Sequence, residues 1–353
     1  MDATLAPETR SPAPAPAVSW SLIRIAQAVA LLLAGWLIAR RRTSLEVTGS
    51  LGIGRSAGPS EDAAPSLLRA SLIVYTGNPD LSAVSRHRPG KPQLPVSEGL
   101  NVLSDLPRAL STDELILHYQ PIVSLGDGSV RGAEGLVRWE HPQHGLLGPG
   151  SFMQVVEQTG LIAPLTRHVL DRAISQCARW RDSGQELSVA VNLSVRNLLD
   201  QDLADDIGSL LNRHSLPPDA LQLEITESMI MTDPDSSLRT LVELSDLGVE
   251  LSVDDFGTGY SSLANLRRLP IDQLKIDRSF VTPMLKDESD LIIVRSTINL
   301  AHDLGLRIVA EGVEDRATLI RLASLGADLA QGYHLSRPLP VAAFEDWRRH
   351  PVD

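Results

Sequence analysis

The chain is predicted to fold as an eight-stranded α/β barrel, because strand-like and helical segments alternate along its larger part. From about residue 105 onward, short apolar runs of strand length alternate with longer amphipathic stretches of helical periodicity. Polar residues recur at or near the C-terminal ends of these runs, where barrels of this class build their active sites. A doubly wound open sheet is the alternative, but no glycine-rich dinucleotide fingerprint follows the first run.

Eight runs are expected to be strands, and helices are expected between most of them. The strand-like runs are 115–123, 130–139, 187–193, 221–226, 249–254, 273–277, 307–311 and 328–332. The clearest helical stretches are 164–182, 236–247, 289–304 and 316–325. Together these elements are expected to form a barrel over residues 105–347, followed by a tail at 348–353.

The first 104 residues are predicted to lie outside the barrel. Residues 1–18 are rich in Pro and Ala and are expected to form a flexible tail. Residues 19–42 contain an apolar stretch with Trp20 and Trp36, followed by arginines at 40–42. This pattern predicts a membrane anchor with its C-terminal side in the cytoplasm, and an amphipathic or partner helix is the alternative. Residues 43–104 are expected to be a disordered linker.

Composition excludes some classes of function. The 353 residues are 43% hydrophobic and 22% charged, with a formal net charge of −12. A basic footprint for duplex nucleic acid is absent, so duplex DNA or RNA is not an expected partner. The one cysteine, Cys177, excludes an intramolecular disulfide and fits a reducing cytosolic location. It is expected to be a small buried apolar residue and not a nucleophile.

Two adjacent carboxylates, Asp254 and Asp255, end the apolar run 249–254 just before Gly257 and Gly259. Neighbouring residues on a regular strand point to opposite faces, but a sharp turn at these glycines would bring both acids to one place. Two carboxylates held together repel each other unless a cation lies between them. The pair therefore predicts a divalent metal site at a strand end.

Further polar residues stand at or near the ends of the other runs. An isolated acid there is usually solvated or caps a helix, Asn192 could form a turn, and Lys275 with Asp277 could be a buried ion pair. Their joint placement instead favours an oxygen-rich site for Mg²⁺ or Mn²⁺. Two such ions could hold a phosphodiester and generate a hydroxide. The residues are Glu134, Asn192, Glu224, Glu227, Lys275, Asp277, Glu311, Glu314 and Gln331.

Eight short motifs, in order along residues 105–347, resemble the EAL-domain cyclic-di-GMP phosphodiesterase family. Each motif is weak alone, and the ordered set is highly specific. The motifs are Tyr119-Gln-Pro-Ile-Val, Glu134-Gly-Leu-Val-Arg-Trp, Asn192-Leu-Ser, Glu224-Ile-Thr-Glu227, Asp254-Asp-Phe-Gly-Thr-Gly-Tyr-Ser-Ser, Lys275-Ile-Asp277, Glu311-Gly-Val-Glu314 and Gln331-Gly-Tyr333.

The resemblance implies a modified TIM-type (β/α)8 barrel that hydrolyses cyclic di-GMP to linear pGpG with two Mg²⁺ or Mn²⁺ ions per site. It also implies a role for each matching residue. One ion would be held by Glu134, Asn192, Glu224 and Asp254, and the other by Asp254, Asp255 and Glu311. Lys275 would position the attacking water, Glu311 would act as base, and Asp277 would orient water or metal. The substrate would contact Gln120, Leu136, Arg138 and Gln331, while Glu227 and Glu314 would support the site.

One position departs from the family pattern. The middle residue of the signature that begins at Glu134 is usually Ala, and here it is Gly135. Glycine adds backbone freedom in a strand, by roughly 0.5–1 kcal/mol, which would loosen Glu134 and lower activity without abolishing it. A non-catalytic cyclic-di-GMP receptor or interaction module is therefore the alternative function. A metal-dependent barrel enzyme of another chemistry is a further one.

The resemblance also bears on partners and location. A homodimer formed through the barrel is typical of the family. The catalytic barrel is expected in the cytoplasm, anchored in the bacterial inner membrane by the helix at 19–42. No cyclase signature or recognisable sensor precedes the barrel in this sequence, so the regulatory signal is not predicted.

Overall fold

The computed structural model describes residues 104–258 and 266–349. All of them belong to one compact unit, residues 89–353. The predicted tail, membrane anchor and nearly all of the linker at residues 1–103 lie outside the described residues, as do Gly259 and the last four residues. In the part that the structure describes, no helix is long and apolar enough to cross a membrane.

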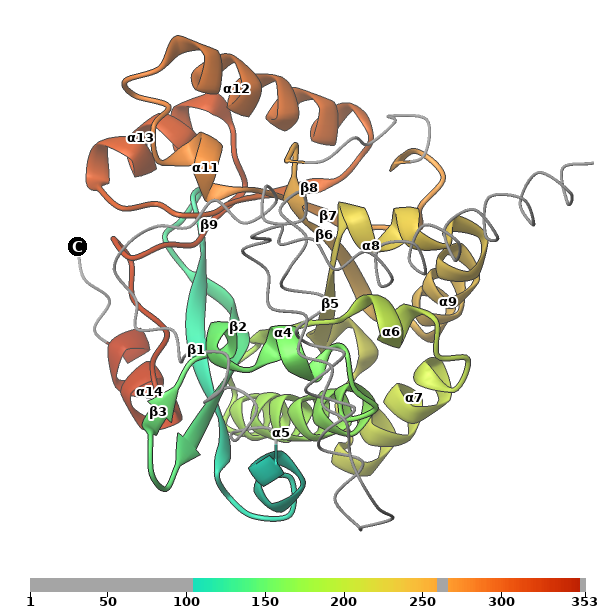
Figure 1. The fold of residues 1–353 in the computed structure, drawn as a ribbon. Helices are drawn as coiled ribbons and strands as arrows, with labels where there is room; N and C mark the ends of the chain where they lie inside the picture. The colour runs from blue at the N-terminus through green and yellow to red at the C-terminus, as the bar shows by residue number, and fades with distance from the viewer. Residues whose placement is uncertain (1–103, 259–265, 350–353) are drawn as a thin grey trace, which may run out of the picture. The chain divides into compact units, whose positions relative to one another are not determined.

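Eight of the strands in the described ranges close into a barrel surrounded by helices (Figure 1). The order around the barrel is β1-β9-β8-β7-β6-β5-β4-β2, and β2 pairs with β1 to complete the circle. A short strand, β3, pairs with β2 outside the circle. The bounds are β1 Leu115–Ser124, β2 Val130–His141, β3 Gly145–Leu147, β4 Ser188–Asn192, β5 Leu221–Thr226, β6 Glu250–Phe256, β7 Gln273–Ile276, β8 Arg307–Ala310 and β9 Leu329–Ala330.

The predicted barrel is confirmed, and each of the eight predicted runs overlaps one of its strands. The four predicted helical stretches correspond to α5 Ile162–Asp182, α9 Pro234–Leu247, α12 Glu288–Asp303 and α13 Arg316–Leu325. The remaining helices within the described ranges are short or lie at the periphery. They are residues 104–109, η1 Pro149–Ser151, α4 Met153–Val156, α6 Val195–Leu198, α7 Leu203–His214, η2 Pro218–Ala220, α8 Glu227–Thr232, α11 Arg278–Val281 and α14 Val341–Arg349.

The first strand departs from a regular (β/α)8 pattern. β1 runs antiparallel to both of its neighbours, β2 and β9, whereas the other adjacent pairs within the barrel are parallel. The link from β1 to β2 is residues 125–129, with Gly128 at φ 71°. A parallel crossover needs about a dozen residues or more, so this short link dictates a hairpin. Its length is visible in the sequence.

Local signals explain where the long helices begin and end. The Asp233 side chain accepts a hydrogen bond from Ser236 N–H at the start of α9, and Pro234 occupies the first turn. Asp315 does the same for Thr318 N–H at the start of α13. Gly248 ends α9 in the left-handed conformation, which glycine adopts without strain.

The apolar core has two parts. The larger part packs between the barrel strands and the surrounding helices, and a small second cluster fills part of the barrel interior with Ile122, Ala190, Val309 and Leu329. The other interior positions are polar. Residues two apart on a strand share a face, so the buried residues Gln222, Ser252 and Gln273 point the same way as Glu224, Asp254 and Lys275 respectively.

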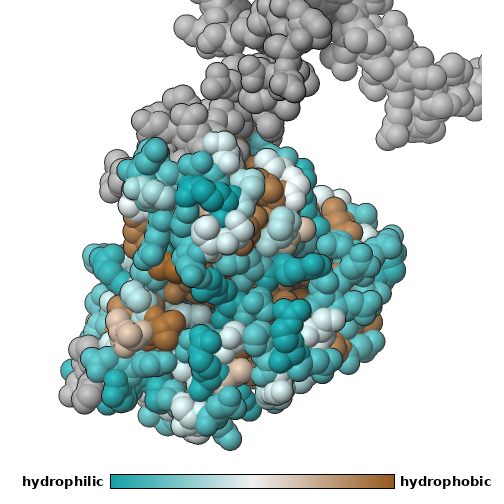
Figure 2. Space-filling model, turned by 90° about the horizontal axis from the view of Figure 1, so that it is seen from below, coloured by the Kyte–Doolittle hydropathy of each residue, from teal (hydrophilic) through white to brown (hydrophobic). Residues whose placement is uncertain are grey.

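The face of the described unit that Figure 2 shows is largely hydrophilic. On the face seen in Figure 2, apolar residues form small separate patches among polar ones. Singly exposed apolar residues are normal for a soluble surface and call for no special explanation. Buried polar residues gather instead at one mouth of the barrel, among them Glu134, Glu224 and Lys275.

Candidate functional site at the barrel mouth

A lysine ammonium lies at the centre of four carboxylates at one end of the barrel. Lys275 on β7 is fully buried, and so is Glu224 on β5. We call these four carboxylates together with Lys275 the carboxylate centre. The distances from Lys275 Nζ are 2.5 Å to Glu311 Oε1, 2.8 Å to Glu224 Oε2, 3.5 Å to Asp254 Oδ1 and 3.9 Å to Glu134 Oε2.

The parallel strands explain why these residues converge. Glu224 and Asp254 stand near the C-terminal ends of β5 and β6, and Glu311 follows β8 directly. The C-terminal ends of parallel barrel strands meet at one mouth. Glu134 differs, because it lies in the first half of β2 and not near its end. It pairs with Ala190 in the last rung between β2 and β4, and beyond it β2 continues past the mouth as a ribbon paired with β1.

Burial and charge shift the protonation equilibria of this centre. Burial opposes the charged form of Lys275, but the surrounding carboxylates outweigh it and hold the lysine pKa well above its usual value. Burial raises the pKa of Glu224 well above its usual range, and the lysine opposes that shift. Burial likewise raises the pKa of Glu311 to about 8. Four carboxylates therefore share one cation in a place where unpaired charge is costly.

Three amide side chains surround this centre. Asn192 Nδ2 donates to Glu134 Oε1 at 2.7 Å, and Gln331 Nε2 donates to Glu134 Oε2 at 2.6 Å and to Gln120 Oε1 at 3.2 Å. Gln120 Nε2 in turn donates to the Ser336 carbonyl at 3.1 Å. The structure thus brings these predicted residues together and fixes the orientation of Glu134.

An irregular end of β6 brings the adjacent acids Asp254 and Asp255 to the same cavity. Asp255 has φ 54°, and the β6–β7 register shifts between Val253 and Phe256. The left-handed residue interrupts the strand alternation, so Asp254 and Asp255 line the same cavity. The predicted convergence is therefore found, but Asp255 itself adopts the unusual conformation before the chain reaches Gly257. Burial, followed by repulsion from Asp254 and Asp277, raises the pKa of Asp255 to about 6.

The cavity at this mouth has a volume of about 320 Å³. Sequence reasoning missed Arg278 as one of its lining residues, although it directly follows the motif that ends at Asp277. Tyr333 also lines the cavity, although no role was predicted for it from the sequence. The lining residues are Gln120, Glu134, Leu136, Asp254, Asp255, Asp277, Arg278, Glu311, Gly312, Glu314, Gln331, Gly332 and Tyr333.

The other predicted site residues surround this cavity or lie nearby. Arg138 is on the β2 ribbon, half-buried, with its guanidinium donating to the Val137 carbonyl at 2.8 Å. Glu227 is buried at the start of α8, and neither of its carboxylate oxygens has a partner among the described residues. Glu227 is predicted to hold the Asp-Asp-Phe-Gly loop at residues 254–257, and among the described residues it forms no hydrogen bond to that loop. Its supporting role stays a prediction.

The donor set at the mouth fits a hard divalent cation in its chemistry. All of the candidate ligands offer oxygen, and Glu224 Oε1 is buried without a hydrogen-bond partner. Within residues 104–258 and 266–349, however, no three His, Cys, Asp or Glu side chains form a ready-made metal cage. The carboxylates are instead gathered on the Lys275 ammonium. The excess of carboxylates over cations at this point is the observation that favours a metal.

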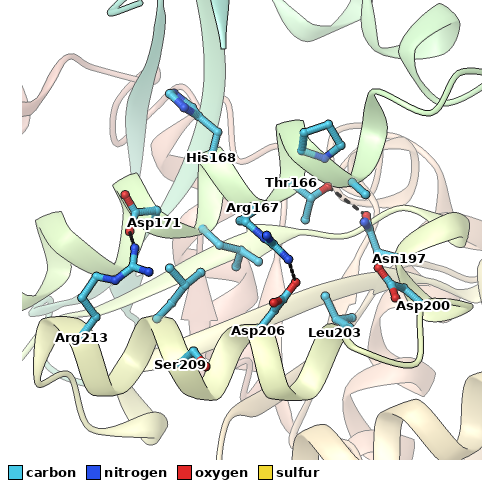
Figure 3. Close-up of a pocket in the computed structure, with 14 residues that line it drawn as sticks. Thr166, Arg167, His168, Asp171, Asn197, Asp200, Leu203, Asp206, Ser209 and Arg213 are labelled. Atoms are coloured by element: carbon cyan, nitrogen blue, oxygen red, sulfur yellow. Dashed lines mark hydrogen bonds and ion pairs between the residues drawn. The ribbon is translucent and has the colours of Figure 1, made fainter. Parts of the chain in front are cut away.

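A second cavity, of about 520 Å³, lies outside the barrel between α5 and α7 (Figure 3). We call it the outer cavity. Across it, Arg167 forms an ion pair with Asp206, and Arg213 Nη1 lies 3.3 Å from Asp171 Oδ1. These pairs are partly exposed and balanced in charge, which is the pattern of an ordinary solvated surface.

Cys177 is a small buried residue of the core, as predicted from the sequence. It is fully buried on α5, and burial raises the pKa of its thiol to about 12. The reactive form of cysteine is the thiolate, so this residue is an inert part of the core.

Comparison with known proteins adds independent evidence. The EAL domain family model matches residues 103–338. The bifunctional diguanylate cyclase/cyclic di-GMP phosphodiesterase MucR of Pseudomonas aeruginosa is 40% identical over 336 residues, covering 95% of this chain and 48% of the relative. The cyclic di-GMP phosphodiesterase NbdA of the same organism is 41% identical over 313 residues, covering 87% of this chain and 39% of the relative.

Solved structures agree on the fold. A PaMucR phosphodiesterase in complex with c-di-GMP superposes with a TM-score of 0.67 and 47% identity, covering 69% of this chain and 99% of that chain. The FimX EAL domain from Pseudomonas aeruginosa bound to c-di-GMP has a TM-score of 0.63 and 27% identity, with coverages of 68% and 96%. The present chain spans less than half of the length of the two curated relatives above. On the extent of the family match and these identities, the chain belongs to the EAL domain family.

Proposed function

We propose that this chain is a metal-dependent phosphodiesterase that hydrolyses cyclic di-GMP to linear pGpG. The observation that carries the proposal is the convergence of four carboxylates on the buried Lys275 at the barrel mouth. The relatives named above as cyclic di-GMP phosphodiesterases point to the same substrate. An interaction module would have no evident use for so much costly buried charge.

Two Mg²⁺ or Mn²⁺ ions are proposed to occupy this mouth. Glu134, Asn192, Glu224 and Asp254 would hold one ion, while Asp255 and Glu311 would hold the second, with Asp254 shared between them. When bound, such ions supply positive charge to a phosphodiester and make water more acidic. The protein orients the Glu134 carboxylate for this role, because Asn192 and Gln331 donate hydrogen bonds to its two oxygens.

Lys275 and Glu311 are proposed to position the attacking water and to accept its proton. Their side chains lie 2.5 Å apart, so a water near one is near both. Glu311, whose pKa is raised to about 8, would accept the proton. Lys275 would hold the water in line and stabilise the charge that develops on the phosphate. Asp277, which also lines the cavity, would orient water or metal.

The substrate is proposed to lie over the cavity and the β2 ribbon. Gln120, Leu136 and Gln331 line the cavity, and Arg138 stands on the ribbon in the same strand as Glu134. The planar guanidinium of arginine matches a phosphate or guanine edge with two parallel hydrogen bonds. Glu227 and Glu314 would support the loops around the site.

The test is hydrolysis of cyclic di-GMP by the full chain with Mg²⁺ or Mn²⁺, with the product identified by chromatography. Metal-dependent formation of pGpG that is lost in Glu134→Ala, and kept in the outer-cavity control Asp206→Asn, supports the proposal. Binding of cyclic di-GMP without turnover, by folded wild-type protein at saturating metal, would instead identify the non-catalytic receptor.

Location and assembly stay predictions. Residues 19–42 are proposed to anchor the chain in the bacterial inner membrane with the barrel in the cytoplasm, and the barrel is proposed to form a homodimer. Membrane fractionation of the full chain beside a variant lacking residues 1–42 tests the anchor. Sedimentation equilibrium of the full chain in detergent tests the dimer.

A further inference from the structure

The segment that follows β9 is locked against β1. Leu339 and Tyr119 exchange two backbone hydrogen bonds, of 2.7 and 2.9 Å. His334 N–H donates to the Val313 carbonyl at 2.9 Å. Gly332 has no room for a side chain, because a Cβ there would lie 2.2 Å from the Val313 carbonyl oxygen. The side chains of this segment are therefore carried on a fixed backbone at the edge of the catalytic cavity.

This segment carries an arginine on an aromatic ring. The Arg337 guanidinium lies over the Tyr333 ring, with its central carbon 4.3 Å from the ring centre. Tyr333 lines the cavity and is 44% exposed. Such stacking orients a guanidinium while leaving its N–H groups free to bind. Burial lowers the pKa of Arg138 on the β2 ribbon, and Tyr333 lies near enough to oppose that shift.

We call Arg138 and Arg337 the rim arginines. Neither forms an ion pair with a carboxylate among the described residues, whereas Arg167, Arg213 and Arg307 each do. Glu134 and Arg138 lie on the same face of the β1–β2 ribbon. In the register of the two strands they stand opposite Gln120 and Ile116 respectively. The ribbon face that holds Glu134 therefore continues to Arg138, and Tyr333 of the segment after β9 carries Arg337 at the same cavity.

We propose that Arg337, positioned by Tyr333, is a specificity-determining residue that binds the second, uncleaved phosphodiester of a cyclic dinucleotide. This inference rests on the proposed function. A cyclic dinucleotide carries two phosphodiesters, and the carboxylate centre with its cations serves the one that is cleaved. The other phosphodiester needs a cationic partner outside the metal site, and a guanidinium binds it through two parallel N–H groups. A substrate with a single phosphodiester would not use Arg337.

The test compares two substrates on the full chain. Arg337→Gln should raise KM for cyclic di-GMP about tenfold, the loss expected for one charge-assisted contact, with kcat changed less than about twofold. Arg337→Lys, which keeps the charge and loses the planar fork, should raise KM about threefold. Both variants should hydrolyse bis(p-nitrophenyl) phosphate, which has one phosphodiester, within about twofold of wild type.

The matched control is Arg349→Gln, which removes an exposed arginine of α14 that lies 3.4 Å from Asp346. It should leave both substrates unaffected. An unchanged KM for cyclic di-GMP in Arg337→Gln, or an equal loss on both substrates, overturns the inference. If wild type turns over neither substrate, the proposed phosphodiesterase function fails instead. Calorimetric Kd values for cyclic di-GMP then decide: about tenfold weaker binding by Arg337→Gln supports the inference, and equal binding overturns it.

Discussion

The carboxylate centre and the outer cavity are both lined by charged side chains, but they hold their charges differently. In the centre, four carboxylates surround one ammonium, and Lys275 and Glu224 are completely buried. In the outer cavity, Arg167 pairs with Asp206 across partly exposed surface, with 62% and 35% of their side chains accessible. Balanced exposed charge contributes little, whereas unbalanced buried charge is costly and persists where chemistry uses it.

The largest difference between the two regions is expected when one cation is removed from each, because the loss of turnover and stability should be large in the carboxylate centre and small in the outer cavity. Lys275→Met should lower turnover of cyclic di-GMP roughly 10³-fold, because it removes the partner of Glu311 and the proposed stabiliser of charge on the phosphate. It should also lower the free energy of unfolding by about 3–5 kcal/mol, since buried carboxylates lose their cation. Urea unfolding in EDTA and a turnover assay measure both effects.

The matched change outside the barrel is Arg167→Met. Its ion pair is largely exposed, so the expected loss of stability is below about 1 kcal/mol, with unchanged turnover. Equal destabilisation by the two substitutions would show that burial does not distinguish these regions.

A metal titration tests whether the centre is built for cations. Mn²⁺ at roughly 100 times its Kd should stabilise the wild-type protein by about 2.7 kcal/mol relative to EDTA. Glu224→Gln should lose most of this gain, because a neutral amide is a weaker ligand for a hard ion. Asp206→Asn, in the outer cavity, should keep the full gain. Thermal unfolding with and without Mn²⁺ provides the measurement, and an undiminished gain in Glu224→Gln would contradict the ligand assignment.

The pH dependence of stability should differ in sign between the mouth and the surface. Burial raises the pKa of Asp255 from 3.8 to about 6, so the folded protein keeps a proton that the unfolded chain has released. Its contribution to the free energy of unfolding is therefore greatest below pH 3.8 and falls as pH rises to about 6. Urea unfolding in EDTA should show this fall in wild type relative to Asp255→Asn.

Asp127, at the surface, is expected to show the opposite dependence of stability on pH. Hydrogen bonds, first from the Ser129 side chain, lower its pKa from 3.8 to about 2. Its stabilising contribution is present above pH 3.8 and is lost as pH falls towards 2. Asp127→Asn should therefore leave the slope above pH 4 almost unchanged. A matching change in slope from both substitutions would rule out Asp255 as the source.

The smallest expected effect concerns the departure from the family signature. A Cβ at Gly135 would lie 3.5 Å from the Ala190 carbonyl oxygen, which is ordinary contact. Gly135→Ala should therefore stabilise the protein by about 0.5–1 kcal/mol through reduced chain freedom, with turnover raised by no more than about twofold. Gly332→Ala is the control, because its Cβ would meet the Val313 backbone at 2.2 Å and should destabilise. Destabilisation by Gly135→Ala would mean that the strand needs glycine there.

The sequence by itself determined the alternation of strands and helices, and with it the barrel. It also placed Asn192, Glu224, Asp254 and Lys275 near strand ends. These signals are local: apolar periodicity sets the elements, and parallel strands bring equivalent ends together. Even the antiparallel first strand could have been read from the short link at residues 125–129.

Tertiary structure decided the rest. The sequence does not show that β2 extends beyond the barrel. Because it does, Glu134 lies well before the end of its strand, and Arg138 lies on a projecting ribbon. Nor does it show that Arg337 stacks on Tyr333. Register and stacking depend on contacts between residues far apart in the chain, and no local propensity encodes which of those partners will meet.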